Sequence, residues 1–385
     1  MNDNLNFTKE ELTRYSRQIT IPEFGLKSQL LLKEASVLCV GAGGLGSAVM
    51  LYLASAGVGT IGVIDNDSVD LSNLHRQIIH DNSTLGDSKT SSAKKRINQI
   101  NPNCIVRVFE ERLNSKNALE LLKEFDFICD GTDNFPAKYL LNDACVILNK
   151  PLIYGSIFKF EGQVSVFNKN NQSPNYRDLL PEPPQNGIIP SCAEGGVLGI
   201  LPGIIGIIQA TETIKLITGL GDCLDGRLLV FNALEMKFKE LHLEKSIPNI
   251  KINKLIDYQE FCGIKDIPTD IDTLISPESL NELINSQINQ VLLVDVRSPL
   301  ERKIDFIENS ISIPLESILN NSRIKFLREK YELNLKIVLY CKSGKRSLKA
   351  FEHLKKQSIY CKSLKDGIDN WNKSISKNNK KKNKK

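Results

Sequence analysis

The sequence predicts two α/β domains, of which the first has a doubly wound, mostly parallel sheet and the second is smaller. Strand and helix patterns alternate over residues 36–150 and again over 276–375, and a glycine-rich turn follows the first apolar strand. A chain of 385 residues also exceeds what one ordinary core organises. The expected parts are a first domain at 1–250, a linker at 251–275, a second domain at 276–375 and a disordered Lys/Asn tail at 376–385.

The N-terminal part shows the alternation most clearly. Thr8 and Glu11 have the spacing of a capping box, which predicts a short helix carrying Arg14. A strand, a glycine turn, a helix and a second strand follow at residues 36–40, 41–46, 47–56 and 60–65. A helix and two strands continue the pattern at residues 88–100, 105–109 and 125–129. This order is typical of a Rossmann-like doubly wound sheet.

The pattern changes after Pro151. Two strands, a polar loop, an apolar helix and a closing strand pair are expected at residues 152–156, 163–167, 168–190, 197–208, 228–232 and 238–243. The apolar segment is shorter than the roughly 20 residues of a membrane span, and Gly199 and Pro202 interrupt it, so we expect a buried helix. Strands at 291–296 and 336–340 belong to the second α/β unit.

The composition, with 41% hydrophobic and 25% charged residues, is that of a soluble globular protein. The formal charge of +5 lies largely in the Lys-rich C-terminus, so we expect neither a nucleic-acid partner nor a membrane partner. The polar N-terminus lacks a secretory signal core, and the scattered cysteines suit reduced thiols. We expect a cytoplasmic protein, or one of the plastid stroma if an organelle genome encodes it.

The glycine turn is the first functional signal. Gly41, Gly43, Gly44 and Gly46 form a G-x-G-x-x-G pattern, whose glycines let backbone N–H groups approach phosphates at a positive helix end. Asp65 ends the next strand, where a carboxylate can hold ribose hydroxyls. These residues alone fit a nicotinamide-dependent oxidoreductase as well as an ATP-binding enzyme.

The residues that follow separate these two alternatives. Hydride transfer has no need of Arg76 and Lys89, whereas adenylation needs cations because negative charge builds on the α-phosphate and the departing pyrophosphate. Asp133 suits Mg²⁺, an ion that takes one or two carboxylates together with phosphate oxygens. Taken singly, Lys89 could also be a solvated helix-start cation. Together the residues favour ATP-dependent adenylation.

These residues resemble the MoeB/ThiF family, which includes the ubiquitin-activating enzymes. The likeness extends over most of residues 7–245 and includes Arg14–Ile19, Ser72–Gln77 and Glu161–Val164. It implies a homodimer in which Arg14 reaches the nucleotide of the other subunit, with Lys89 and Asp133 catalytic and Mg²⁺ on Asp133. The ATP contacts that it implies are Gly41, Gly43, Gly44, Gly46, Asp65, Ser72, Asn73, Leu74, His75, Arg76, Lys89, Asp133 and Asn134. We expect His75 and His80 to be ordinary loop histidines, since adenylation demands no acid–base step from them.

The family's zinc site is a clear departure. Many members hold structural Zn²⁺ between two Cys-x-x-Cys pairs. Here the first location reads Asn175-Tyr-Arg-Asp178, and the second offers only Cys262. We therefore expect no zinc, and a loop over 168–190 that packing alone holds or that stays mobile.

A second functional signal is the segment Cys341-Lys-Ser-Gly-Lys-Arg346, which follows an apolar strand and leads into a helix. Backbone N–H groups of such a loop, with Lys342, Lys345 and Arg346 nearby, should help Cys341 to ionise and to hold a persulfide. The residues around Asp295 and Arg297 resemble rhodanese domains over roughly 275–375, and we expect these two residues to support the loop.

The second domain departs from the rhodanese pattern at one place. Asp305-Phe-Ile307 stands where such domains often have Gly-His-Ile, which weakens no catalytic assignment. A phosphatase loop of the related pattern would need Cys-x-x-x-x-x-Arg, and Arg346 comes one residue too early, so we prefer sulfur transfer to phosphate hydrolysis.

The other cysteines divide into one functional candidate and several core residues. Cys192 lies in a loop rich in glycine and proline, and the family resemblance implies that it attacks an acyl intermediate or resolves a disulfide. Cys39, Cys129 and Cys145 lie in apolar strand or helix patterns and are expected in the core.

The expected activity is ATP-dependent adenylation of the C-terminal glycine of a ubiquitin-like sulfur carrier ending in Gly-Gly, followed by sulfur transfer from Cys341. By resemblance, the first choice of carrier is the small subunit of molybdopterin synthase. A thiamine-pathway carrier, a tRNA-thiolation modifier or a role as a silent binding scaffold are the alternatives. The sulfur donor is expected to be a cysteine desulfurase or thiosulfate.

Overall fold

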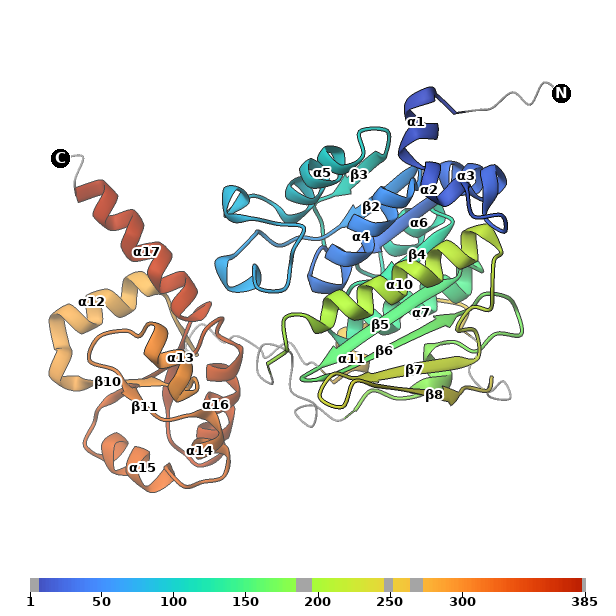
Figure 1. Cartoon of the computed structure of the whole chain (residues 1–385). Helices are drawn as coiled ribbons and strands as arrows, with labels where there is room; N and C mark the ends of the chain where they lie inside the picture. Colours follow the sequence, from blue (N-terminus) through green and yellow to red (C-terminus); the bar gives the residue numbers. More distant parts are fainter. Residues whose placement is uncertain (1–6, 185–195, 246–251, 264–272, 383–385) are drawn as a thin grey trace. The chain divides into compact units, whose positions relative to one another are not determined.

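The structure, a computed structural model, describes residues 7–184, 196–245, 252–263 and 273–382 (Figure 1). The chain divides into two compact units, one through Lys265 and one from Asp266 onward. This division lies inside the segment 251–275 that we predicted as the linker. Each unit has its own sheet and its own core, so each is described by itself.

The first unit is built on an eight-stranded sheet. Its strands, in the order in which they lie side by side, are β3 (Ile105–Phe109), β2 (Thr60–Ile64), β1 (Ser36–Val40), β4 (Phe127–Asp130), β5 (Leu152–Phe158), β6 (Glu161–Phe167), β7 (Arg227–Asn232) and β8 (Lys237–His242). The pairing is parallel from β3 to β5 and antiparallel from β5 to β8. The doubly wound, mostly parallel sheet that the sequence predicts is therefore confirmed.

Helices cover both faces of this sheet (Figure 1). One face carries α3 (Gly25–Glu34), α4 (Gly44–Ala56), α5 (Lys89–Ile100) and α10 (Leu201–Thr218), and the other carries α6 (Ala118–Lys123), α7 (Phe135–Leu148), α8 (Tyr176–Leu179) and α11 (Tyr258–Phe261). Short elements are α1 (Lys9–Arg14), α2 (Ser16–Ile19), η1 (Leu71–Asn73) and η2 (Asn82–Thr84). The capping box predicted at Thr8 is present at the start of α1.

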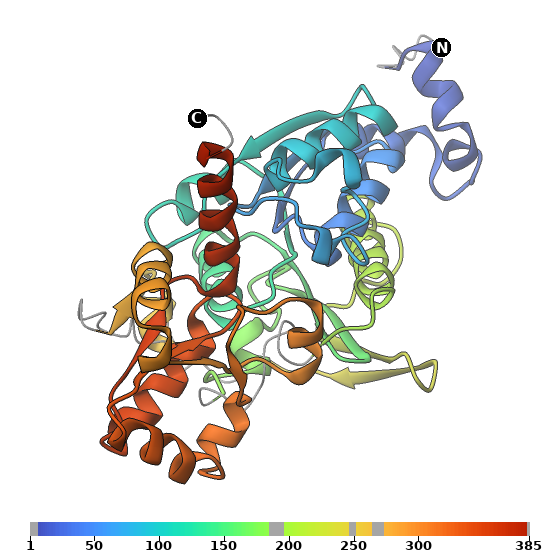
Figure 2. The same ribbon diagram turned by 90° about the vertical axis from the view of Figure 1, so that its left-hand side faces the viewer.

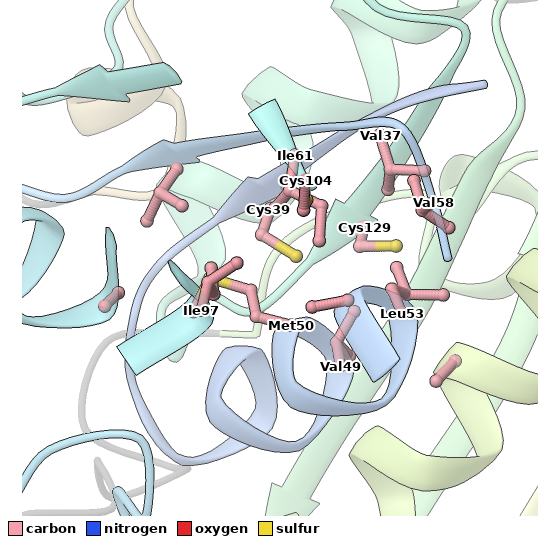
Figure 3. Close-up of a cluster of buried hydrophobic side chains, with 14 of the residues drawn as sticks. Val37, Cys39, Val49, Met50, Leu53, Val58, Ile61, Ile97, Cys104 and Cys129 are labelled. Carbon is pink, nitrogen blue, oxygen red and sulfur yellow. The ribbon is translucent and has the colours of Figure 1, made fainter. Parts of the chain in front are cut away.

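The core on the α4 side contains three cysteines. Cys39, Cys104 and Cys129 lie among aliphatic side chains (Figure 3) and are all buried. Burial raises the pKa of the Cys104 thiol to about 12. Cys145 is buried on the opposite face, so the core positions predicted for Cys39, Cys129 and Cys145 are confirmed.

The apolar segment forms helix α10, which continues to Thr218, beyond the predicted end. Gln209 lies fully buried in the middle of α10 and donates from Nε2 to the backbone oxygens of Asp130 and Ile153. These bonds fasten α10 to the ends of β4 and β5. Within the described residues, no helix is both long and apolar enough to cross a membrane.

The second unit has a five-stranded sheet in which every pairing is parallel. Its strands, in spatial order, are β11 (Ile311–Ser312), β10 (Val291–Asp295), β12 (Lys336–Tyr340), β13 (Cys361–Leu364) and β9 (Leu274–Ile275). The helices are α12 (Pro277–Gln287), η3 (Ile288–Gln290), α13 (Pro299–Ile304), α14 (Leu315–Leu319), α15 (Ile324–Glu332), α16 (Lys345–Lys356) and α17 (Gly367–Lys382). A smaller α/β unit after the first one is thus confirmed.

Two predicted boundaries differ from the structure. Part of the predicted linker folds on the first unit, because Tyr258 and Cys262 are buried against α7. The predicted disordered tail is also partly helical, since α17 runs to Lys382 (dark red in Figure 2). The composition of these segments did not indicate either result. A few aromatic residues hold α11 against the first unit, and α17 continues into the Lys-rich end because Lys is a good helix former.

Candidate nucleotide and thiol sites

The glycine turn lies where the strand order of the first sheet reverses. The turn follows β1, and the segment Asp130–Asn134 follows the adjacent parallel strand β4. In open α/β sheets, ligands bind at such a switch point, beyond the carboxyl ends of the strands. The topology thus brings together two segments that are about 90 residues apart in the sequence.

Close packing explains three of the four glycines. A Cβ atom at Gly41, whose φ is +99°, would lie 2.7 Å from the Gly131 oxygen, and one at Gly46 would lie 2.0 Å from the Gly41 oxygen. One at Gly44 would lie 2.9 Å from the Pro202 Cβ. Gly43 is the N-cap of α4, and the nearest atom to a Cβ there would be the Gln77 Nε2, at 3.9 Å. The N-terminus of α4 beside Gly43 is therefore the position for an anionic group.

Asp65 is tied to the glycine turn. Its Oδ2 accepts from the Ala42 N–H at 2.8 Å, and its Oδ1 accepts from the Asp67 N–H at 2.8 Å. Lys89, at the start of α5, is buried and pairs with the Asp67 carboxylate at 2.8 Å. The predicted residues Asp65 and Lys89 consequently lie at the same end of the sheet, with Lys89 engaged by a carboxylate.

The segment Ser72–Gln77 packs against the turn, since the Arg76 backbone oxygen lies 3.4 Å from the ideal Cβ position of Gly44. The Arg76 guanidinium donates to the Asn73 Oδ1 at 2.9 Å and to the Ser72 oxygen at 3.2 Å. It also lies 3.3 Å from the His75 Nε2. Leu74 and His75 belong to the same loop, so the predicted contact residues from Ser72 to Arg76 gather beside the turn.

The two carboxylates that follow β4 have different surroundings. Asp130 is buried, accepts from the Thr132 N–H and hydroxyl, and pairs with Lys138 at 2.7 Å. Burial alone would lower the pKa of Lys138, but the charge of Asp130 reverses this, and the pKa is raised. Asp133 is exposed and receives only a long bond of 3.3 Å from the Asn134 amide among the bonds of the described chain. Asp133 is therefore the carboxylate that remains available to a ligand.

Asp133 and Asn134 lie where a magnesium nucleotide is expected to bind. Asn134 is the N-cap of α7, so its Oδ1 is engaged by the Ala137 N–H. Across the described residues, no three His, Cys, Asp or Glu side chains gather as a metal site, and Mg²⁺ bound mainly by substrate phosphates does not require such a group. One free carboxylate, Asp133, beside a helix N-terminus fits a magnesium nucleotide.

Two further side chains at this site are buried. His80 lies in a loop, as expected, and its Nδ1 and Nε2 contact the Ser92 hydroxyl and the Ala42 oxygen. Burial lowers the pKa of His80, and the Lys89 charge adds to this effect. Gln77 is also buried, and its Oε1 has no hydrogen-bond partner within the described structure, which suits a polar ligand beside the turn. Gln77 belongs to the segment Ser72–Gln77 that carries the family resemblance, whereas no local pattern distinguished His80.

Arg14 lies on α1, where its Nη1 donates to the Ile100 oxygen at 2.8 Å and its Nη2 pairs with Glu10 at 3.3 Å. These contacts place it at the C-terminal end of α5, away from the residues gathered at the turn of its own chain. Its predicted role across a dimer therefore stays a proposal.

The two segments that hold zinc in the resembling family meet in this structure, but a different cluster joins them. Arg177 of α8 donates to both oxygens of Asp143, at 2.9 and 2.7 Å, and the Tyr258 hydroxyl donates to the same carboxylate at 2.8 Å. The guanidinium carbon also lies 4.8 Å from the Phe261 ring centroid and 5.1 Å from that of Tyr139. We call these five residues the Arg177 cluster.

The Arg177 cluster does not fit zinc. Burial raises the pKa of the Cys262 thiol to about 11, although Arg177 lowers it in part, so the thiol stays protonated. Zinc needs thiolate or imidazole ligands, and a buried guanidinium would repel a divalent cation. In this chain, ion pairing and packing join the two segments.

We expect Asp143→Ala to destabilise the first unit by about 3 kcal/mol or more, because it leaves the Arg177 charge buried without its partner. Chemical denaturation measures the loss, and Asp222→Ala, at an exposed carboxylate, is the matched control. A zinc chelator should leave the Tm of the wild-type chain unchanged. A lower Tm with chelator, or stoichiometric zinc in the purified protein, would contradict the assignment.

The second site lies at the end of β12. Cys341 is 1% exposed, and Gly344, with φ of +87°, turns the chain into α16. Lys342 and Lys345 are exposed, whereas Arg346 forms two bonds of 2.6 and 2.7 Å with the Glu301 carboxylate. Burial would raise the pKa of Glu301, but the Arg346 bond lowers it to about 2. The charge of Arg346, which we expected to act on the sulfur, is therefore shared with Glu301.

Asp295 and Arg297 lie beside the strand that leads into the loop, and their expected support of the loop stays a prediction. Arg297 is buried and pairs with Asp295 at 2.9 Å and with Asp305 at 2.8 Å. The Val296 N–H donates to the Tyr340 oxygen, the residue before Cys341. Asp305, which departs from the family pattern, thus contributes an ion pair. Cys192 lies outside the described residues.

Nucleotide chemistry at a doubly wound switch point and thiol chemistry in a separate α/β unit define an adenylating enzyme joined to a sulfurtransferase. Two family models match the chain, the ThiF family over residues 15–252 and the rhodanese-like domain over residues 276–374. The chain therefore belongs to the ThiF family and carries a rhodanese-like domain.

Named relatives agree with this assignment. The probable adenylyltransferase/sulfurtransferase MoeZ of Mycobacterium tuberculosis is 45% identical over 377 residues, which are 96% of this chain and 94% of that protein. The adenylyltransferase and sulfurtransferase MOCS3 of Drosophila sechellia is 39% identical over 388 residues, covering 96% and 85%. The chain is thus an adenylyltransferase with a sulfurtransferase domain.

The solved structure of E. coli MccB with MccA-N7isoASN has a TM-score of 0.57 to this chain at 21% identity. The match covers 65% of this chain and 76% of that one. At this identity the likeness shows the fold alone.

Proposed function

We propose that this chain adenylates the C-terminal glycine of a ubiquitin-like sulfur carrier and converts that glycine into a thiocarboxylate with sulfur carried on Cys341. The observation that supports this most directly is the presence of both sites in one chain. Adenylation without a sulfur carrier would leave the cysteine loop of the second unit without a substrate.

The first step is the attack of the carrier's carboxylate on the α-phosphate of ATP, with pyrophosphate as the leaving group. Backbone N–H groups near Gly43 and the cations Arg76 and Lys89 offset the developing negative charge. Lys89 pairs with Asp67 at 2.8 Å, which holds its ammonium at the strand ends. Mg²⁺, when held by Asp133, would neutralise phosphate charge.

The second step transfers sulfur. The terminal sulfur of a persulfide on Cys341 attacks the acyl carbon, AMP leaves, and an acyl disulfide with Cys341 forms. The Cys192 thiolate then attacks the Cys341 sulfur, so that the thiocarboxylate leaves and a Cys192–Cys341 disulfide forms. A cellular thiol reduces this disulfide before the next cycle.

The oligomeric state, the carrier, the sulfur donor and the location are proposed from the resemblance to the MoeB/ThiF family. We propose a homodimer in which Arg14 reaches the partner's nucleotide. The proposed carrier is the small subunit of molybdopterin synthase, which would place the chain in molybdenum cofactor biosynthesis. The donor is a cysteine desulfurase or thiosulfate, and the location is the cytoplasm or the plastid stroma. A thiamine-pathway or tRNA-thiolation carrier is the second candidate, because all three kinds of carrier end in Gly-Gly.

The test is ATP–pyrophosphate exchange with the full chain. We expect exchange only when a ubiquitin-like protein ending in Gly-Gly is added, because its carboxylate is the nucleophile. The matched control is the same carrier without its last two glycines. Equal exchange with the truncated carrier, or none with any Gly-Gly carrier, would refute the proposal and leave the silent scaffold as the better reading.

A further inference from the structure

Two buried serines form a chain of hydroxyl groups behind the cysteine loop of the second unit. The Ser363 hydroxyl, on β13, donates to the Ser347 Oγ at 2.8 Å. The Ser347 hydroxyl, on α16, lies 3.6 Å from the Cys341 Sγ and 3.0 Å from the Gly344 oxygen. Both serines are fully buried and Cys341 is 1% exposed, so water does not compete for these bonds.

The two serine hydroxyls can respond to the charge on the Cys341 sulfur. Ser347 has one proton and two acceptors within reach, the Gly344 oxygen and the Cys341 Sγ. Because Ser363 donates to the Ser347 Oγ, the Ser347 proton remains available for one of them. A neutral thiol is a weak acceptor and the carbonyl is favoured, whereas a thiolate accepts a stronger, charge-assisted bond.

The charged side chains around the loop are exposed or paired, so on the buried side of Cys341 the nearby donors are the serine hydroxyls. Lys342 and Lys345 are exposed, and Arg346 is paired with Glu301 of α13. Other charged side chains near the loop are Asp295, which ends β10 and pairs with Arg297 and Arg302, and the exposed Lys362, Lys365, Asp366 and Asp369 from β13 to the start of α17. A buried sulfur anion therefore needs a donor on the inner side of the loop.

We infer that Ser347 is a positioning residue that stabilises the Cys341 thiolate from the buried side, with Ser363 orienting its hydroxyl. This inference rests on the proposed role of Cys341 as the sulfur carrier. The thiolate is the form that attacks the donor's sulfane sulfur. The two serines would thus act on the loading of Cys341 with sulfur.

The test is the rate of Cys341 alkylation by iodoacetamide against pH, measured on the full chain by peptide mass spectrometry. We expect Ser347→Ala to move the midpoint of this profile to higher pH and to slow alkylation at neutral pH about tenfold or more, the usual effect of losing a bond to a charged group. Ser347→Thr should restore the profile, and Ser363→Ala should shift it less. Ser343→Ala, at an exposed hydroxyl in the same loop, is the matched control.

An unchanged midpoint in Ser347→Ala, with Cys341 still alkylated, would overturn the inference. If Ser347→Ala does not fold, Ser363→Ala decides, and an unshifted midpoint there has the same meaning. This readout needs neither ATP nor a carrier. Normal thiocarboxylate formation by Cys341→Ala would refute the proposed function, whereas the alkylation profile would still report the hydrogen bond.

Discussion

Asp133→Ala is expected to lower ATP–pyrophosphate exchange by about 100-fold or more, because the variant loses the exposed carboxylate proposed to hold Mg²⁺ at the switch point. The structure makes Asp133 the better candidate of the two carboxylates after β4. Asp130 is buried and already bonded to Thr132 and Lys138. Within the described residues, the change at Asp133 breaks one long bond, from Asn134, so stability should be little affected.

The measurement is exchange at saturating carrier and a range of Mg²⁺ concentrations. Asp222→Ala, which removes another exposed carboxylate from the same unit, should exchange at the wild-type rate. An Asp133→Ala enzyme that exchanges normally at every Mg²⁺ concentration would show that the metal ligand is misassigned.

Cys341→Ala should abolish thiocarboxylate formation while pyrophosphate exchange stays near the wild-type rate. The physical reason is the division of the chain into two units with separate sheets, since adenylation uses residues of the first and sulfur is carried by the second. Intact-mass measurement of the carrier after one turnover detects the added sulfur. Cys223→Ala, at a cysteine of the first unit with no proposed role, is the control.

A second variant, Cys192→Ala, separates the carrying of sulfur by Cys341 from the release of the thiocarboxylate. Cys192→Ala should form the acyl disulfide with Cys341 and stop there, leaving an adduct that dithiothreitol cleaves. If Cys341→Ala makes thiocarboxylate without added sulfide, the carrier assignment is wrong. If Cys192→Ala turns over normally without reductant, Cys192 has no part in release.

Much of the fold was predictable because its signals are local. The alternation of strand and helix patterns, the glycine turn and the capping box at Thr8 each depend on residues within a few positions of one another. The same holds for the order Cys341 to Arg346 between a strand and a helix. The family resemblance used these local runs, and the matches over residues 15–252 and 276–374 agree with it.

Composition misled the prediction in two places. Residues 251–275 are rich in Ile, Asn, Lys and Pro, which favoured a linker, yet Tyr258 and Cys262 are buried on α7. The Lys-rich end favoured disorder, yet α17 extends to Lys382. In the first case, a few apolar side chains find a surface that only the folded unit provides.

The sequence by itself determined which chemical groups are present and which strand ends carry them. Only the tertiary structure decided their partners: Asp130 with Lys138, Lys89 with Asp67, and Arg346 with Glu301. The tertiary structure also decided the pairing of Arg177 with Asp143, near the segments that correspond to the family's zinc site. It likewise decided the contact between the Ser347 hydroxyl and the Cys341 sulfur. The reason is physical, because such pairs join residues on different elements. Their distance depends on strand order and side-chain direction, which no local pattern encodes.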